Sequence, residues 1–501
     1  MVLVIVALTR ALCRKAGEEK NCRVERLERL LRWEMIGSGT LTREIAAFLA
    51  RTGFDALDAG ALRATKEHIL YTLGTILAGS SAPGIEQAFA GARALNGRSE
   101  ESTVLVSGEK LPAASAALVN ATMGHSRELD INDDRIAYKS SVTVVPAALA
   151  LAEKAGKVSG KDFIASVCLG VDLGIRLGLA TNPKPVHARA IALGPFAAAA
   201  ACGKILALDE SGMHNALGIA FCRSTVAGNS TVAPSLTKRL GVGFASQSGV
   251  VAALLASAGY PAAGEVLQGA AGFFQTFYQQ EGDYEQLVDQ LGRRFEIVLV
   301  GPKPFPSCRY THGAVTGVLE LQRRHAMQAR DVAEVRVRIG ERDMRSVGGW
   351  SEDEKRKKRR PEGVVDAQFS IPYTVAATLI HGRLSLEEFT EAKLRSEEIL
   401  DLAARVRTIL TPEFDHGPMD VKPQWVEIVM RDGKVFGEKI IYPKGNPNNP
   451  VTAEEVVGAF RGMASYATKP MSAAKVDDAI AVALRLEEEK DVAVLAQLLT
   501  A

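Results

Sequence analysis

The feature that most constrains the fold is a helical pattern that extends over residues 41–291. Apolar residues recur there at spacings of three and four, as in residues 61–77 and 163–177, which is typical of helices that pack against one another. Residues 188–206 and 241–258 are unusually rich in Ala and Gly. Small side chains let helix backbones approach closely, so we expect these two segments to be inner helices of a packed domain.

The pattern changes near Phe295, where short alternating runs replace the helical spacing. We expect a hairpin around Asp432 and Gly433, because an Asp-Gly pair between alternating runs is a strong turn signal. Strands are expected at residues 296–300, 334–339 and 405–410, and in the hairpin at residues 425–431 and 435–442. Helices are expected between them, at residues 313–324 and 370–381.

The chain turns helical again after residue 445, where Thr452 and Glu455 have the spacing of a capping box. We therefore predict a mostly α fold with an α+β part, in which an α+β lid domain is inserted before C-terminal helices that return to the helical domain. The predicted divisions are residues 1–34, a loosely ordered N-terminal extension; 35–296, the helical domain; 297–446, the lid; and 447–501, the returning helices.

Composition excludes several classes of protein. The chain has 501 residues, 60 of them basic and 58 acidic, so it lacks the basic excess of a dedicated nucleic-acid binder. A basic run at residues 355–360 is flanked by acidic residues, as in a solvated loop. The six cysteines form no CxxC pair, and no membrane span or signal peptide is evident. We expect a cytoplasmic protein that binds neither nucleic acid nor membrane, with no metal ligand cluster.

Four clusters combine polar side chains with positions at which helices begin or end. They are residues 120–141, which hold many acidic groups; 184–189, with His187; 235–241, with Lys238; and 303–312, with Lys303 and two prolines. Each has a plain structural alternative: a solvated acidic loop, a core or capping histidine, or ordinary helix capping. Polar groups at a helix start near residue 311 would form a natural anion site.

Known cofactor motifs are absent, since the chain contains no strand-following GxGxxG, no P-loop and no HExxH. We therefore expect acid/base catalysis by protein side chains, with Lys and Arg binding anionic groups. Removing a proton beside a carboxylate builds negative charge on that carboxylate, so lysines near it stabilise the transition state more than the ground state.

In this order, the four clusters resemble the MmgE/PrpD family, which includes 2-methylcitrate dehydratase, cis-aconitate decarboxylase and iminodisuccinate epimerase. The resemblance extends from about residue 41 to the C-terminus and also includes residues 368–373 and 442–445. It implies a helical domain with an α+β lid, a homodimer, and a site between the domains that needs neither metal nor cofactor. The implied catalytic residues are His187, Lys139, Glu128, Asp130 and Tyr373, and the implied substrate-binding residues are Lys238, Lys303, Cys308, Arg309 and His312.

Three of these positions differ from the family pattern. Glu128 stands where many members have Asp, Lys139 where members usually have a proton-transferring His, and Cys308 where the decarboxylases have a His. Lys139 is either a second base or an anion anchor, and its two acidic neighbours in sequence favour the anchor. We expect a lyase or isomerase of the 2-methylcitrate dehydratase type. The alternatives are an epimerase, a cis-aconitate decarboxylase-type enzyme, or an inactive binding or scaffold homologue.

Overall fold

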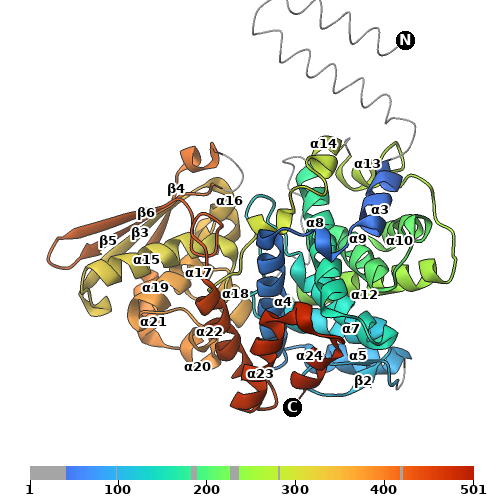
Figure 1. The fold of residues 1–501 in the computed structure, drawn as a ribbon. Helices are drawn as coiled ribbons and strands as arrows, with labels where there is room; N and C mark the ends of the chain where they lie inside the picture. Colours follow the sequence, from blue (N-terminus) through green and yellow to red (C-terminus); the bar gives the residue numbers. More distant parts are fainter. Residues whose placement is uncertain are drawn as a thin grey trace, which may run out of the picture.

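The computed structural model describes residues 41–96, 99–181, 189–225, 236–279, 282–417 and 421–500. The predicted N-terminal extension lies outside these residues. The fold is mostly α with an α+β part, as predicted. Figure 1 shows a helical domain on one side, a domain with a four-stranded sheet on the other, and the C-terminal helices beside the helical domain.

The helical domain is built from long helices around a core of small and aliphatic side chains. Its longer helices are α3 (Leu41–Arg51), α4 (Ala59–Gly79), α5 (Ile85–Asn96), α6 (Ala113–His125), α7 (Ser141–Ala155), α8 (Gly160–Ala180), α9 (Arg189–Ile205), α10 (Glu210–Arg223) and α12 (Thr237–Ser257). The short elements are η2 (Phe54–Ala56), β1 (Ser102–Thr103), β2 (Lys110–Leu111), α13 (Phe273–Tyr278), α14 (Tyr284–Val288) and η3 (Glu296–Leu299).

The Ala-rich helix α9 is an inner helix, as expected from its composition. The expectation is wrong for α12, because this helix packs one face on α9 and α6 and leaves Phe244 and Leu255 exposed. A Cβ atom on Gly170 of α8 would lie 2.6 Å from the Ala197 carbonyl oxygen of α9, so this approach requires glycine. Helices α8 and α12 are long and apolar enough to cross a membrane by length and composition. The apolar window of α8 is 94% buried, as expected of a core helix.

The second domain has a mixed sheet with the strand order β4-β3-β5-β6, in which β3 and β4 are parallel and the other pairs antiparallel. Its strands are β3 (Val332–Ile339), β4 (Val406–Leu410), β5 (Gln424–Met430) and β6 (Val435–Ile440). Its helical elements are η4 (Arg309–Thr311), α15 (His312–Arg324), η5 (Ala329–Asp331), α16 (Glu341–Asp343), η6 (Met344–Gly348), α17 (Glu352–Arg359), α18 (Val364–Gln368), α19 (Ile371–His381), η7 (Leu386–Phe389), α20 (Glu391–Leu394), α21 (Glu397–Ala404) and η8 (Pro412–Asp415).

The predicted hairpin is confirmed: β5 and β6 pair around Gly433, whose φ of 87° suits glycine. The strand expected at residues 296–300 is wrong, because Glu296–Leu299 forms the short helix η3. The backbone N–H of Glu296 donates to Asp172 Oδ1 of α8 at 2.7 Å. A side chain therefore supplies the acceptor that a neighbouring strand would otherwise supply.

The C-terminal helices are α22 (Ala453–Ala464), α23 (Ala473–Leu484), η9 (Leu486–Glu488) and α24 (Ala493–Leu498). Thr452 and Glu455 form the predicted capping box at the start of α22. Phe460 and Met463 of α22 belong to the core of the helical domain, and both approach Gly74 of α4. Figure 1 shows these helices in red beside α4. The division into residues 35–296, 297–446 and 447–501 stays a prediction.

The basic run was expected in a solvated loop, but its residues 355–359 lie on α17 and Arg360 directly follows the helix. Acidic neighbours pair with the run. Lys355 lies 2.7 Å from Glu352, and Asp353 pairs with Arg356 at 2.6 Å and with Lys357 at 2.9 Å. The helix therefore neutralises much of its own charge.

Candidate active site

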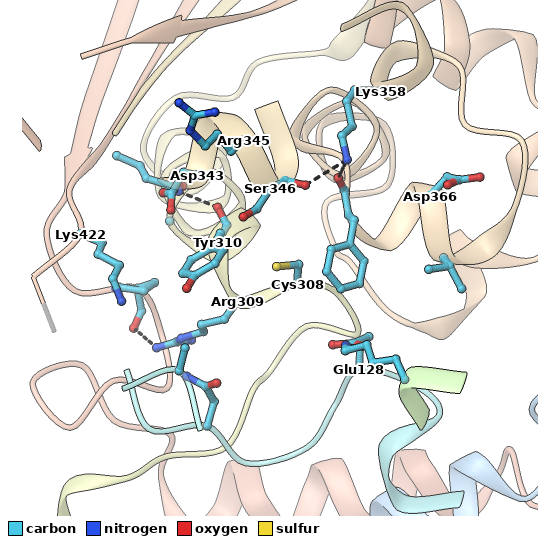
Figure 2. Close-up of a pocket in the computed structure, with 18 of the residues that line it drawn as sticks. Glu128, Cys308, Arg309, Tyr310, Asp343, Arg345, Ser346, Lys358, Asp366 and Lys422 are labelled. Atoms are coloured by element: carbon cyan, nitrogen blue, oxygen red, sulfur yellow. Dashed lines mark hydrogen bonds and ion pairs between the residues drawn. The ribbon is translucent and has the colours of Figure 1, made fainter. Parts of the chain in front are cut away.

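A pocket of about 800 Å³ lies between the two domains. The helical domain lines it with residues of the loop between α6 and α7 and with Lys238 at the start of α12. The second domain lines it with Cys308, Tyr310, parts of α16 to α18, Lys422 and Gln424. Figure 2 shows Glu128 on one wall, with Asp343, Lys422 and Lys358 on others.

The loop at residues 126–140 carries the acidic cluster noted in the sequence. Glu128 and Ala137 have φ values of 55° and 52°, a left-handed conformation that non-glycine residues rarely adopt. Asn132 N donates to Gly301 O at 3.0 Å, and Asp133 and Tyr138 exchange backbone hydrogen bonds. These contacts hold the loop in a shape that exposes Glu128 to the pocket, and such strain is common at functional sites.

Glu128 and Asp130 are buried and share a cation. Lys303 Nζ lies 3.2 Å from a carboxylate oxygen of each. Lys238 donates to the other oxygen of Glu128, and His125 Nδ1 lies 3.2 Å from Asp130. The structure thus brings together four of the predicted residues, Glu128, Asp130, Lys238 and Lys303, with His125 behind them.

These contacts keep the group ionised despite burial. Burial opposes the charge on Glu128, but Lys238 and Lys303 outweigh it and hold the Glu128 pKa well below its usual value. Burial likewise opposes the charge on Asp130, whose pKa is lowered by Lys303 and His125. Lys303 is buried too, yet Asp130 and Glu128 raise its pKa. The group is therefore a charged network inside the protein.

Lys139 lines the same pocket but has a weaker set of contacts. Within the described part of the chain, its Nζ donates only to the Ala137 carbonyl oxygen, at 3.5 Å. Its pKa is lowered by burial first and then by Lys303 and Lys238, which together outweigh Asp130 and Glu128. We expected Glu128 and Asp130 to keep Lys139 in its charged form. This expectation is wrong, because those carboxylates already pair with the other two lysines.

We call Lys139, Lys238 and Lys303 the lysine cluster. When all groups are ionised, the cluster carries one more charge than Glu128 and Asp130 together balance. A buried net charge is costly unless a partner neutralises it. A carboxylate entering the pocket would supply that partner.

Cys308, Arg309 and His312 were all predicted to bind the substrate, but the structure gives each of them different contacts. Cys308 lines the pocket, and burial raises the pKa of its thiol, so the neutral thiol faces the ligand space. Arg309 also lines the pocket, but it donates to both oxygens of Asp134 at 2.8 and 2.7 Å. Asn446 donates to the same carboxylate at 2.9 Å. Arg309 therefore joins the two domains.

His312 is fully buried, and the pocket lining does not include it. Its Nδ1 lies 3.2 Å from Arg309 Nη1, and burial followed by Arg309 holds its pKa well below the usual value. The anion site expected at the start of α15 is also occupied by protein, because Ala314 N donates to Gln424 Oε1 at 2.6 Å. The prediction that His312 contacts the substrate directly is therefore wrong. His312 lies behind the pocket wall, against Arg309.

Tyr373 is placed away from the pocket. It is buried in the core of the second domain against Phe389, and its hydroxyl donates to the Glu388 carbonyl oxygen at 2.6 Å. Its predicted part in proton donation is corrected to a packing role, since a buried hydroxyl with this partner is already satisfied.

Tyr373→Phe tests that correction. We expect a loss of about 1 kcal/mol of stability from the missing hydrogen bond, with kcat changed less than about twofold. Urea unfolding and steady-state kinetics would measure both. A large fall in kcat with normal stability would return Tyr373 to the mechanism.

His187 lies outside the described residues, so its part in the site stays a prediction. The sequence also missed pocket residues of the second domain, chiefly Asp343, Lys358, Lys422 and Phe369. Asp343 and Lys422 lie in no motif, whereas Lys358 lies in the basic run and Phe369 in the segment 368–373, neither of which singled them out as site residues. Among the residues that the structure describes, no three His, Cys, Asp or Glu side chains are grouped to hold a metal ion.

Fold and site together define a two-domain protein whose interdomain pocket has the charge to receive a small anion. The chain belongs to the MmgE/PrpD family. The MmgE/PrpD N-terminal domain matches residues 43–285, and the MmgE/PrpD C-terminal domain matches residues 305–486.

Curated relatives are similar over most of the chain. Cis-aconitate decarboxylase of Aspergillus terreus is 28% identical over 414 residues, covering 78% of this chain and 82% of the relative. The cis-aconitate decarboxylase-like protein oryM of Aspergillus oryzae is 26% identical over 487 residues, covering 92% and 98%. Human cis-aconitate decarboxylase is 27% identical over 406 residues, covering 78% and 80%.

Proposed function

We propose that this protein is a lyase that acts on a small polycarboxylic acid by moving a proton beside a carboxylate, with no metal. The observation that carries the proposal is the lysine cluster on the pocket wall, where Asp130 and Glu128 keep the fully buried Lys303 in its charged form. A carboxylate bound there would gain negative charge during reaction, and fixed ammonium groups stabilise such charge strongly in a site that excludes water.

Decarboxylation is the first candidate reaction, because the relatives are named for the decarboxylation of cis-aconitate. When the bond to the leaving carboxylate breaks, its electron pair passes toward a neighbouring carboxylate, and a proton is then taken up at carbon. Lys238 and Lys303 would hold the carboxylate that receives the charge. Lys139 and His187 are the candidates for proton transfer.

Dehydration of a 2-methylcitrate-type acid is the second candidate. It is favoured by the neutral thiol of Cys308, which stands where the resemblance places a His in the decarboxylases. Dehydration removes a proton beside a carboxylate and expels hydroxide as water, so it also uses the lysine cluster. An epimerase would need two opposed bases. The comparisons do not favour an inactive scaffold homologue.

The test is incubation of the protein with cis-aconitate, citrate and 2-methylcitrate, followed by NMR in deuterated buffer. Decarboxylation would release CO2 and place deuterium in the product, whereas dehydration would give an unsaturated acid that retains every carboxylate. Deuterium exchange without net conversion would indicate an epimerase. No change in any acid would contradict the proposal.

Activity should survive chelation. Lysines supply the positive charge that a metal would otherwise bring, so EDTA should leave kcat/KM within about twofold. The check is the same NMR assay with and without EDTA. Activity that is lost with EDTA and restored by a divalent ion would contradict the metal-independent mechanism.

We also propose that the protein is a cytoplasmic homodimer that binds neither nucleic acid nor membrane. The family resemblance supports the dimer, and the pairing of acidic and basic groups on α17 supports the absence of nucleic-acid binding. Sedimentation would show twice the chain mass for a dimer.

A further inference from the structure

The pocket continues well beyond the lysine cluster. One cavity of about 800 Å³ is lined by Glu128 and Lys139 at one end and by Asp343 and Lys422 at another. Pockets of roughly 300–1,000 Å³ normally enclose drug-sized ligands, so a small tricarboxylate held at the lysine cluster would leave much of this space empty.

The far end is a built polar site. Gln424, at the start of β5, is nearly fully buried and donates through Nε2 to Asp343 Oδ2 and to the Tyr310 carbonyl oxygen, each at 2.6 Å. Its Oε1 accepts from Ala314 N at 2.6 Å. These bonds fix the Asp343 carboxyl group at the pocket wall, where Figure 2 shows it near Tyr310.

Lys422 stands beside this carboxyl group with unused donors. Its Nζ donates to the Asp134 carbonyl oxygen at 2.9 Å and lies 5.5 Å from the centre of the Tyr310 ring. Among the described residues, no carboxylate forms an ion pair with it. An ammonium group has three N–H donors, so Lys422 can still donate into the pocket.

The charges around Asp343 balance when Asp343 is ionised and are net positive when it is protonated. Lys422 and Arg342 face Asp343, with Asp415 behind it, while the nearby Asp134 is neutralised by Arg309 at 2.7 Å. Burial raises the pKa of Asp343 to about 6, and burial followed by Arg342 lowers the pKa of Lys422 to about 8. Near pH 6, Asp343 is partly protonated and Lys422 is charged, so both can donate hydrogen bonds to an anion.

We propose that Lys422 and Asp343 form a second anion subsite, which binds the distal carboxylate of a polycarboxylate longer than cis-aconitate. This rests on the proposed function, because the other end of the ligand would occupy the lysine cluster. Cys308 lies between the two ends (Figure 2), and Phe369 lines the pocket with its ring centre 4.9 Å from Lys238 Nζ, so both can contact an aliphatic chain.

Calorimetric titration tests the subsite without requiring turnover. The probes are cis-aconitate and a series of its homologues whose distal carboxylate is separated by additional methylene groups. We expect the best homologue to bind roughly tenfold or more tightly than cis-aconitate, because one charge-assisted hydrogen bond contributes that much. Lys422→Met should bring the ratio of the two dissociation constants close to one, whereas Lys422→Arg should keep a preference for the longer acid.

Lys434→Met is the matched control, since Lys434 is exposed on the β5–β6 hairpin and pairs with Asp432. It should leave the ratio unchanged. Asp343→Asn should keep the preference but weaken its pH dependence. In the wild type, the advantage of the longer acid should fall as pH rises from about 6 to about 8, because a bound anion stabilises protonated Asp343 and charged Lys422.

The results separate this inference from the proposed function. Turnover of cis-aconitate without any preference for longer acids would overturn the subsite and leave the lyase assignment in place. If a longer acid binds in a Lys422-dependent way but no acid is turned over, the subsite is supported and the proposed lyase function is contradicted. A preference that survives in Lys422→Met would also overturn the subsite.

Discussion

Lys303→Met should lower kcat strongly and also reduce the stability of the fold. Lys303 is fully buried and lies 3.2 Å from both Glu128 and Asp130, so its removal leaves two buried carboxylates with less compensation. Removing one partner of a buried ion pair costs about 3–5 kcal/mol. The loss of a positioned cation should lower kcat by roughly 10²–10³-fold. Urea unfolding and the NMR assay would measure the two effects.

Lys66→Met is the matched control. Lys66 forms a 2.8 Å ion pair with the partly exposed Glu487, and neither residue lines the pocket. Such pairs contribute at most about 1 kcal/mol, so the control should be close to the wild type in both measurements.

The double variant Lys303→Met with Glu128→Gln separates stability from catalysis. Neutralising Glu128 removes one of the uncompensated charges, so part of the stability should return. Activity should not return, because the site has then lost a cation and a carboxylate. Recovery of activity in the double variant would show that Lys303 is needed only for folding.

Local signals predicted most of the fold. The hairpin of β5 and β6 follows from alternating residues around Asp432 and Gly433, and the cap of α22 follows from Thr452 and Glu455. The error at residues 296–300 arose because alternation describes a strand only if a neighbouring strand is present. Here the Glu296 backbone bonds to Asp172, which is distant in sequence.

The candidate site was predictable on the helical side and along the connection to the second domain. Glu128, Lys238 and Lys303 stand in motifs near helix ends, and the fold brings them together. Asp343 and Lys422 were not predictable, because Gln424 and the Asp134 carbonyl position them across long sequence separations. Tyr373 was assigned to the site from its motif alone. Its apolar neighbours Ile371 and Val375 are fully buried with it. These apolar neighbours in the sequence indicated that Tyr373 belongs to the core.

Lys139→Arg should be nearly inactive if Lys139 transfers a proton. The structure favours this role, since burial and the two other lysines lower the Lys139 pKa and increase its neutral fraction. Arginine does not deprotonate in proteins, so it keeps the charge and loses the base. We expect kcat to fall roughly 10²-fold or more. An anion anchor would behave differently, because arginine binds carboxylates well and would retain much activity.

The pH dependence adds to the Lys139→Arg result. If Lys139 removes a proton, as dehydration requires, it acts in its neutral form, so the wild-type kcat/KM should rise with pH through a pKa below the usual lysine value of about 10.4. If Lys139 donates the proton that decarboxylation requires, kcat/KM should fall with pH while Lys139→Arg stays inactive. Lys139→His should move that rise toward about pH 6.5, and Lys139→Arg should remove it. An anchor acts in its charged form, so the activity it supports would instead fall as pH rises through the same pKa. A falling profile, together with an active Lys139→Arg variant, would therefore assign Lys139 to carboxylate binding and leave proton transfer to His187.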